Sequence, residues 1–487
     1  MVKRILFTIV LTTVYFYNVE SRESFHSDPN FSARENAYFL HQVEKGQTIY
    51  SISVFYGVTV EAIYKLNPES EKGIKIGESL KIPQQNISAP SKDAFTVKAK
   101  ESEIKSETET ETETEIIPVP EATINTASIN VALLLPFGTV DRDADPSNQN
   151  QRLVEYYEGF LLALDSLKKA GISVNLHVYD IGNHAESLQT ILNKKELKDN
   201  HLIIGGKTEE QIKSISDYSQ TNGIWYAVPF SSKADETLVN PYVFQINPPQ
   251  ALLYSSVSQA FIDKYKEYRI IFVNIPNMAD SQSKFIQTLQ IHLSKKNLQY
   301  NELVYNASTF AINIREALSK DKKNIIVLSS ASSTALMRVM SPLKSLKESN
   351  TFTDVSLFGY PEWQTYFKDH IDDFFLTNAC LYSVFYVDHA NENIRKFYET
   401  FKSWYRKIPT NTYPKYGLLG YDTGMYFIQM FHRQGTACDA FAEPMKYQSL
   451  QSGFYFKRLS EWGGFVNNNV FLIDFLPDYT IKKTVIK

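Results

Sequence analysis

A run of alternating glutamate and threonine over residues 107–115 limits what this chain can fold into. The run belongs to a stretch, residues 84–127, that also contains Pro118 and Pro120. Like charges at every second position repel one another, and the stretch has too few apolar side chains to form a core. A calcium loop would need carboxylates converging around a glycine turn, which is missing here. Residues 84–127 are therefore interpreted as an extended acidic linker between folded parts.

The linker also explains the charge of the chain. The 487 residues carry a net charge of −4. Residues 84–127 hold nine acidic residues and four lysines, a net charge of −5, so the rest of the chain stands at +1. A nucleic-acid partner is excluded, because neutralising phosphates needs a strongly basic surface. Two cysteines, Cys380 and Cys438, are too few for a structural zinc site, and their spacing leaves open whether they pair.

The amino terminus has the pattern of an export signal. Lys3 and Arg4 precede an uncharged, mostly apolar run of 13 residues, Ile5 to Tyr17. This run is too short to span a membrane comfortably and suits a signal peptide, which we place at residues 1–21. An uncleaved anchor stays open as the alternative. No cysteine lies near this segment, so we expect an exported periplasmic or cell-envelope protein that is not a lipoprotein.

Residues 38–83 predict a small β-α-α-β module. Residues 39–43 alternate as a short strand, and Thr48 can cap a first helix. Thr59 can cap a second helix that stops before Pro68. The apolar alternation around Leu80 predicts the last strand.

Five segments of this module, in order, resemble the LysM domain. They are His41-Gln42-Val43-Glu44-Lys45-Gly46, Gln47-Thr48-Ile49, Tyr56-Gly57-Val58, Leu66-Asn67-Pro68 and Ile76-Gly77-Glu78-Ser79-Leu80-Lys81-Ile82-Pro83. The resemblance implies a shallow groove for peptidoglycan and other N-acetylglucosamine glycans, lined by Gly46, Gln47, Thr48, Ile49, Asn67 and Pro68. Each of these residues also suits a plain structural role, as a turn, a helix cap, a core side chain or a helix end. Gln47 departs from the acidic residue usual in the family.

Residues 128–487 predict a two-lobed, doubly wound α/β domain. The apolar run Ile129 to Leu135 is typical of a parallel strand covered on both faces. Strands and helices then alternate through about residue 228, and a second such series begins at Arg269. Two lobes of similar build fit this length better than one sheet. The end of the chain, from Trp462 through residues 470–476, is interpreted as a terminal hairpin.

Residues 128–431 resemble type I periplasmic binding proteins, the branched-chain amino-acid receptor kind. The segments that carry the likeness are Ile129-Asn130-Val131-Ala132-Leu133-Leu134-Leu135-Pro136-Phe137, Tyr157-Glu158-Gly159-Phe160, Ile203-Ile204-Gly205-Gly206, Pro229-Phe230-Ser231-Ser232, Phe358-Gly359-Tyr360-Pro361-Glu362-Trp363 and Leu419-Gly420-Tyr421-Asp422-Thr423-Gly424. The resemblance implies a ligand held between the lobes by loops at the carboxyl ends of strands, which agrees with the general rule for open α/β sheets.

Polar and aromatic residues that follow predicted strands are the candidate cleft residues: Gly206, Lys207, Thr208, Phe230, Ser231, Ser232, Asn274, Ser329, Ser330, Tyr360 and Trp363. Thr208 and Gln211 have the spacing of a capping box, so backbone amides gather there that can take a carboxylate. The expected ligand is a small polar solute such as an amino acid or peptide. The alternative for each residue is a loop side chain that satisfies its own backbone.

Catalytic patterns are missing from the sequence. The nine histidines form no His-x-His and no His-Glu-x-x-His pattern, and Ser-x-x-Lys recurs without its partner motifs. Cys380 and His389 suggest a thiol dyad, but the apolar surroundings of Cys380 favour an inert buried thiol. We therefore expect no catalytic residues, no metal and no cofactor.

Together these patterns predict an exported, wall-tethered binding protein that is not an enzyme. The alternative is a scaffold or regulator of an envelope peptidoglycan enzyme, with a vestigial ligand cleft and an envelope protein as partner.

Overall fold

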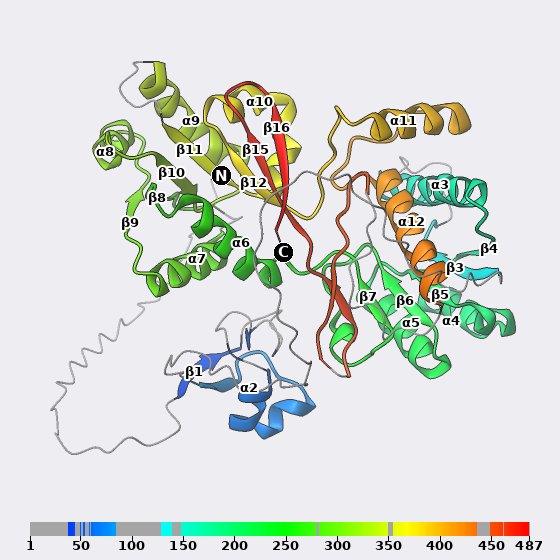
Figure 1. The fold of residues 1–487 in the computed structure, drawn as a ribbon. Coiled ribbons are helices and arrows are strands. Elements are labelled where there is room, and N and C mark those ends of the chain that lie inside the picture. The colour runs from blue at the N-terminus through cyan, green and yellow to red at the C-terminus, as the bar shows by residue number, and fades with distance from the viewer. Residues whose placement is uncertain are drawn as a thin grey trace, which may run out of the picture.

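The computed structural model describes residues 38–43, 49, 52, 53, 58, 60–83, 128–138, 148–278, 282–348, 354–435, 449–460 and 462–486. Figure 1 shows a small module, drawn in blue with β1 and α2, and a larger part built as two lobes. The predicted signal peptide, the predicted linker, Cys438 and residues 44–48 lie outside the described residues.

The small module is a two-stranded sheet with a helix packed on it. Strand β1 (Tyr38–Gln42) pairs antiparallel with β2 (Ser79–Pro83), as predicted. The second predicted helix is α2 (Val60–Leu66), and η1 (Pro68–Lys72) follows it. The core of the module is formed by Val43, Ile49, Ile52, Ile63, Leu80 and Ile82.

Lobe 1 is a seven-stranded sheet in the order β13-β14-β7-β6-β5-β3-β4. Its strands are β3 (Ile129–Leu135), β4 (Val174–Asp180), β5 (Leu202–Gly205), β6 (Trp225–Val228), β7 (Val243–Gln245), β13 (Phe456–Arg458) and β14 (Phe465–Asn467). All neighbouring strands are parallel except β13 and β14. Its helical elements are α3 (Asn148–Lys169), α4 (Ala185–Leu192), η2 (Lys195–Asp199), α5 (Glu209–Asn222), η3 (Asp235–Leu238), α11 (Glu392–Tyr405) and α12 (Tyr416–Gln434).

The two faces of the lobe 1 sheet explain why β3 is apolar throughout. Val131 and Leu133 face a cluster that includes α3 and α12, whereas Ala132 and Leu134 face a second cluster with α4 and α5. A strand covered on both faces needs apolar residues at every position. The interpretation of residues 129–135 as a parallel strand covered on both faces is therefore confirmed.

Lobe 2 repeats the plan in the order β16-β15-β12-β11-β10-β8-β9. Its strands are β8 (Arg269–Asn274), β9 (Tyr300–Val304), β10 (Asn324–Leu328), β11 (Val355–Gly359), β12 (Cys380–Ser383), β15 (Val470–Phe475) and β16 (Ile481–Ile486). The first five pair in parallel, and β15 and β16 add antiparallel strands beyond β12. Its helical elements are α6 (Gln250–Tyr265), α7 (Ser283–Lys295), α8 (Phe310–Ala317), α9 (Ser333–Glu348), η4 (Pro361–Tyr366) and α10 (Phe367–Leu376).

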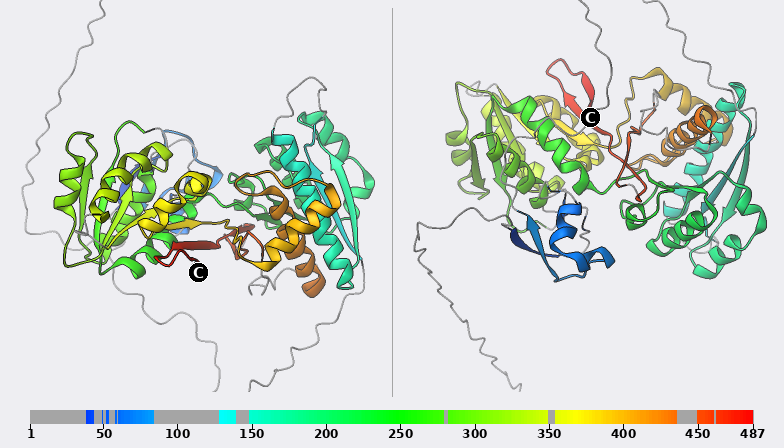
Figure 2. Two further views of the ribbon diagram at one scale, coloured as in Figure 1. Left: turned by 90° about the horizontal axis from the view of Figure 1, so that it is seen from above. Right: turned by 60° about the horizontal axis from the view of Figure 1, so that its bottom comes forward.

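The chain passes between the lobes three times. It leaves lobe 1 between β7 and α6, returns between β12 and α11, and leaves again between β14 and β15. Figure 2 shows the two lobes side by side with the carboxyl-terminal strands running between them. The three passages form the hinge, so each lobe is built from two separate stretches of the chain.

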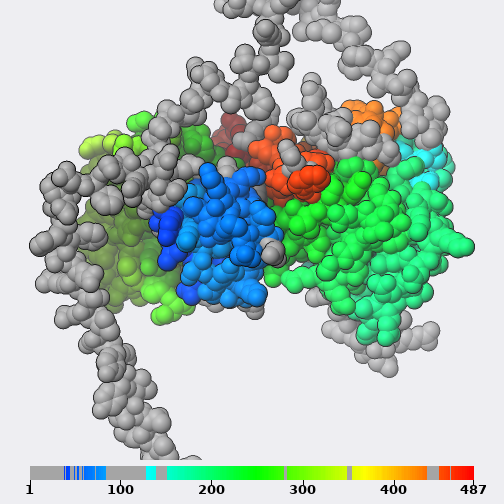
Figure 3. Space-filling view, turned by 90° about the horizontal axis from the view of Figure 1, so that it is seen from below, coloured from blue at the N-terminus to red at the C-terminus, as the bar shows by residue number. Residues whose placement is uncertain are grey.

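The carboxyl-terminal residues do not form one hairpin. The apolar segment 470–476 does form a strand, β15, but its antiparallel partner is β16, which the prediction did not include. Phe465, however, lies in β14, which pairs parallel with β7 in the other lobe. The prediction was wrong on this point because parallel pairing with a distant strand leaves no local signal in the sequence. Figure 3 shows this orange-red segment at the surface beside the green surface of lobe 1.

Helices α3 and α12 pack against each other closely in lobe 1. A Cβ atom on Gly420 would lie 1.9 Å from the carbonyl oxygen of Tyr156, and one on Gly159 would lie 1.8 Å from that of Gly417. Both glycines are required because two helix backbones meet there. None of the described helices is long and apolar enough to cross a membrane.

Candidate functional site

In lobe 1 the predicted cleft residues follow the adjacent strands β5 and β6. Gly206 is buried with a φ of +71°, and a Cβ atom there would lie 2.7 Å from the Tyr226 hydroxyl. Thr208 caps α5 through the predicted capping box. The side-chain oxygen of Gln211 accepts hydrogen bonds from the backbone N–H of Lys207 (3.0 Å) and of Thr208 (3.3 Å). Two amides expected to take a carboxylate therefore already have a partner within the chain.

The segment after β6 places an aromatic ring and two serines at the end of the sheet. The half-buried Phe230 ring stacks on Tyr416, with ring centres 5.8 Å apart and planes 9° apart. It also meets Tyr156 edge-on at 4.8 Å. Ser231 bonds both backbone groups of Lys233, at 2.8 and 3.0 Å, whereas Ser232 is exposed. The stack connects the β6 loop to the start of α12.

In lobe 2 the predicted polar residues follow β8 and β10. Asn274 is exposed, and its side-chain oxygen accepts a hydrogen bond of 3.3 Å from the Ser329 hydroxyl. That hydroxyl also accepts from the backbone N–H of Ile275 at 2.8 Å. Ser330 is buried and lies 3.2 Å from the Ser332 hydroxyl. Asn274 and Ser329 thus form a linked pair at the end of two neighbouring strands.

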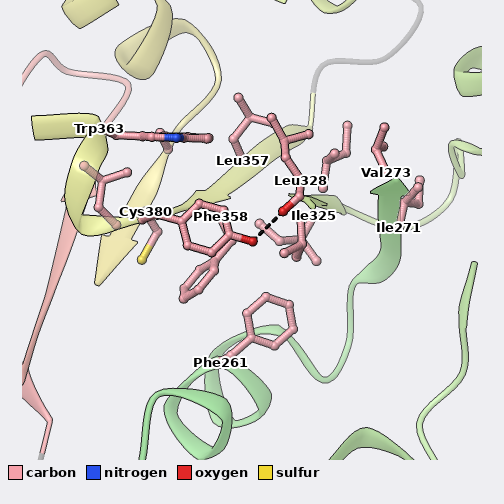
Figure 4. Close-up of a cluster of buried hydrophobic side chains, with 14 of the residues drawn as sticks. Phe261, Ile271, Val273, Ile325, Leu328, Leu357, Phe358, Trp363 and Cys380 are labelled. Carbon is pink, nitrogen blue, oxygen red and sulfur yellow. Dashed lines mark hydrogen bonds between the residues drawn. The ribbon is translucent and has the colours of Figure 1, made fainter. Parts of the chain in front are cut away.

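Tyr360 and Trp363 do not line a cleft. Both are fully buried, in the core of lobe 2. The Tyr360 hydroxyl donates to the backbone carbonyl of Leu328, the dashed line in Figure 4. Trp363 stacks on Phe374 at 5.6 Å with planes 4° apart. The prediction that Tyr360 and Trp363 contact a ligand is therefore wrong. Both follow strand β11, but their side chains point into the core and not toward solvent.

The described LysM-like residues have structural partners. Ile49 is 6% exposed and belongs to the module core. The Asn67 side chain donates to the carbonyls of Ile63 (2.8 Å) and Lys81 (2.7 Å) and accepts from the Lys81 N–H (2.8 Å), which joins the end of α2 to β2. Pro68 begins η1. Gly46, Gln47 and Thr48 lie outside the described residues.

Two charged residues at the hinge were missed by the sequence reasoning. Arg152, in the first turns of α3, is half-buried and hydrogen-bonded to Tyr416. Its Nε atom is buried and has no hydrogen-bond partner within the described part of the chain. Glu362, in η4 of lobe 2, accepts a bond of 3.4 Å from Gln250 with one oxygen. Its Oε2 atom is likewise buried and unpartnered within the described residues.

The electrostatic neighbours of these two residues place both near the start of α12. Burial raises the pKa of Tyr413, and the nearby Glu362 carboxylate raises it further. Burial also raises the pKa of Tyr416, an effect that the Arg152 guanidinium opposes. Tyr413 and Tyr416 are three residues apart. A cation from lobe 1 and an anion from lobe 2 therefore each act on a tyrosine of the same short segment, residues 413–416, which leads into α12.

Such an arrangement suits a ligand with charges of both signs. A guanidinium with an unused N–H is a donor for a carboxylate, and a buried carboxylate oxygen is an acceptor for an ammonium group. One of these two residues could have been found from the sequence, because Glu362 lies in the segment 358–363 that resembles the receptor family. Nothing in the local pattern indicated that Glu362, rather than the buried Tyr360 or Trp363, would be the candidate ligand residue of this segment.

The described residues contain no cluster of three or more His, Cys, Asp or Glu side chains that could hold a metal ion. Cys380 is a free thiol with no exposed surface, and burial raises its pKa to about 12. Its polar neighbours are Lys264, whose Nζ lies 3.6 Å from Sγ, together with Asp474 and Tyr265. A protonated thiol in a core is a poor nucleophile.

Comparison with known proteins identifies the small module and the fold of the larger part. Residues 41–83 match the family model of the LysM domain. A Rhodospirillum rubrum protein provisionally described as a branched-chain amino acid ABC transporter has a similar fold, with a TM-score of 0.51 at 13% identity. The match covers 74% of this chain and all of that protein.

A second solved structure gives a similar coverage. A branched-chain amino acid ABC transporter periplasmic ligand-binding protein from Burkholderia xenovorans LB400 matches with a TM-score of 0.46 at 14% identity, over 74% of this chain and 95% of that one. No curated protein matches the sequence. The chain thus joins a LysM domain to a two-lobed fold of the type I periplasmic-binding-protein kind.

Proposed function

We propose that the protein is an exported receptor held at the cell wall by its LysM domain, which binds N-acetylglucosamine-containing peptidoglycan. The match of residues 41–83 to the LysM family carries this proposal. The basic and apolar amino-terminal segment, residues 1–21, supports export, and the acidic stretch 84–127 would separate the wall-binding domain from the receptor.

Co-sedimentation with purified peptidoglycan sacculi tests the wall-binding part. The intact chain is expected in the pellet, and a chain that lacks residues 38–83 is expected in the supernatant. Soluble chitin fragments should release the intact protein if the domain reads N-acetylglucosamine. Equal sedimentation of both chains would assign the binding to another part of the protein.

The two-lobed domain is proposed to hold a small zwitterionic solute, such as an amino acid or a short peptide, between its lobes. Arg152 of lobe 1 and Glu362 of lobe 2 support this ligand class, because each is charged, half-buried, and has one unpartnered polar atom among the described residues. The name of the Rhodospirillum protein also refers to an amino acid. A ligand that contacts both residues would draw the lobes together, and closure would be the binding event.

A regulatory role is a second candidate, favoured by the internal partners of many predicted cleft residues. Phe230 is stacked on Tyr416, Ser231 bonds Lys233, and Tyr360 lies in the core. Such a domain would act through its surface on an envelope peptidoglycan enzyme. Co-purification of one such enzyme from crosslinked envelopes, together with melting curves that no solute shifts, would favour this function over solute capture.

A further inference from the structure

A separate cavity of about 640 Å³ opens beside the second passage between the lobes. Its walls come from both lobes and from the hinge. Lobe 2 contributes Gln364, Thr365, Phe367, Lys368, Ile371 and the hairpin turn at 479–481. The passage contributes 385–390, the segment before α12 contributes 411–413 and Lys415, and Gln451 completes the lining. None of the predicted cleft residues lines this cavity, nor do Arg152 and Glu362. We call it the hinge pocket.

The charged lining of the hinge pocket is mainly cationic. It contains Lys368 and Lys415 against one carboxylate, Asp388, together with the imidazole of His389. Asp388 is partly engaged, since it accepts a hydrogen bond of 3.0 Å from the backbone N–H of Ala390. The pocket therefore favours an anionic ligand.

Lys415 is the half-buried cation of the hinge pocket and the best candidate to bind an anion. Its Nζ donates to the neutral side chain of Asn411 at 2.8 Å. No carboxylate among the described residues lies within ion-pair distance of Lys415. Burial lowers its pKa, and the negative charge of Glu155 opposes this effect without reversing it. His389 lies near enough that the Lys415 charge lowers its pKa as well.

The walls around these cations are fixed by internal bonds. Gln364 donates to the Ser383 hydroxyl at 2.9 Å and to the Phe385 carbonyl at 3.0 Å. Gln451 bonds both backbone groups of Lys415, at 2.8 and 3.2 Å. Tyr386 adds an aromatic surface to the lining. A pocket with a ring surface and a cation is suited to a small ligand with a carboxylate and a compact polar body.

We propose that the hinge pocket binds a small carboxylate attached to a sugar ring or a peptide, with Lys415 as the carboxylate partner, Lys368 as a second cation and His389 as a hydrogen-bond donor. The volume lies within the range of small-ligand pockets. Because the walls belong to both lobes, the occupant holds the lobes at one angle and so changes closure at the cleft. The proposal does not depend on the identity of the cleft ligand.

The test measures binding of three probes to the full-length protein by calorimetry. N-acetylmuramic acid carries a carboxylate on a sugar, N-acetylglucosamine has the same ring without it, and alanyl-glutamate carries carboxylates on a peptide. The variants are K415M, which keeps most of the apolar stem, and H389Q. K457M, on the exposed strand β13, is the matched control.

The expected result is that one carboxylate probe binds and loses at least tenfold in affinity in K415M but not in K457M. The probe that binds distinguishes a sugar source from a peptide source. Probe that binds to the LysM domain is distinguished by its affinity, which K415M should leave unchanged because Lys415 lies outside residues 41–83. If K415M fails to fold, the same loss is required of H389Q and K368M. Absence of binding by both carboxylate probes, or equal binding by wild type and the folded variants, would overturn the proposal.

Discussion

Glu155 on α3 and Thr410, which precedes α12, are joined by a buried network of hydrogen bonds. Both carboxylate oxygens of Glu155 accept from the Thr410 backbone N–H, at 2.9 and 3.0 Å, and one also accepts from its hydroxyl. Glu155 has no exposed surface. The network fixes the segment that carries Tyr413, Lys415 and Tyr416, and hence the hinge residues of both proposed sites.

Replacement of Glu155 by Gln is expected to lower the free energy of unfolding by about 1–3 kcal/mol, because an amide N–H₂ would face donors and leave them unpaired. Urea unfolding of the full chain measures the change. Glu209→Gln is the control, since Glu209 is largely exposed and pairs only at the surface with Lys233 at 3.6 Å. Similar effects of the two substitutions would show that the Glu155 network contributes little.

The close contact of α3 and α12 gives a matched pair of glycine substitutions. Gly420→Ala is expected to destabilise by about 1–3 kcal/mol or more, because the added methyl would overlap the Tyr156 carbonyl oxygen at 1.9 Å. Gly417→Ala, one turn earlier, meets its nearest atom at 3.4 Å and should be tolerated, with a helix-propensity gain of up to about 1 kcal/mol. Thermal unfolding compares them, and equal effects would contradict the packing described here.

The pH dependence of stability should include His389. Burial, and then the Lys415 charge, lower the pKa of His389, while Asp388 acts in the opposite direction. The unfolded chain therefore takes up this proton more readily than the folded protein, so stability present above the ordinary pKa of 6.5 falls as the pH drops through the lower folded-state value.

Urea midpoints measured between about pH 7 and pH 5 test this expectation. The slope should be shallower in His389→Gln than in the wild type. His184→Gln, at the exposed amino end of α4, serves as the comparison. An unchanged slope in His389→Gln would show that His389 does not contribute to the pH dependence of stability.

Cys380 should be inert in the folded protein. In a Cys438→Ser chain, 5,5′-dithiobis(2-nitrobenzoic acid) at pH 8 is expected to label less than about one tenth of the protein, since the thiol is buried and its pKa is raised to about 12. Denatured protein should react with one equivalent. Rapid labelling of the folded chain would revive the idea of a reactive thiol.

The sequence predicted the strands of both lobes well, because central strands of a parallel sheet are apolar on both faces. The run Ile129 to Leu135 became β3 with the same bounds, and the capping box at Thr208 was confirmed at the start of α5. The LysM segments also stood out, since turns, caps and strand alternation recur at short range in the sequence. These features depend on neighbours along the chain.

The site could be predicted only in part, because its geometry depends on distant residues. Sequence position placed Tyr360 after a strand but not its bond to Leu328, which holds it in the core. Arg152 became a candidate only through Tyr416, which lies 264 residues further along the chain. Contacts of this kind are set by how α3 and α12 pack and by the three passages between the lobes.

Melting of the full-length protein with a panel of amino acids and short peptides tests solute capture most directly. At least one zwitterionic solute is expected to raise the melting temperature. At about 100 times its Kd the solute should contribute about 2.7 kcal/mol. Arg152→Met and Glu362→Gln should each abolish the shift, whereas Lys457→Met should retain it. Unshifted melting across the panel, or equal shifts in the Arg152 and Glu362 variants, would contradict the proposal that the two lobes hold such a ligand between them.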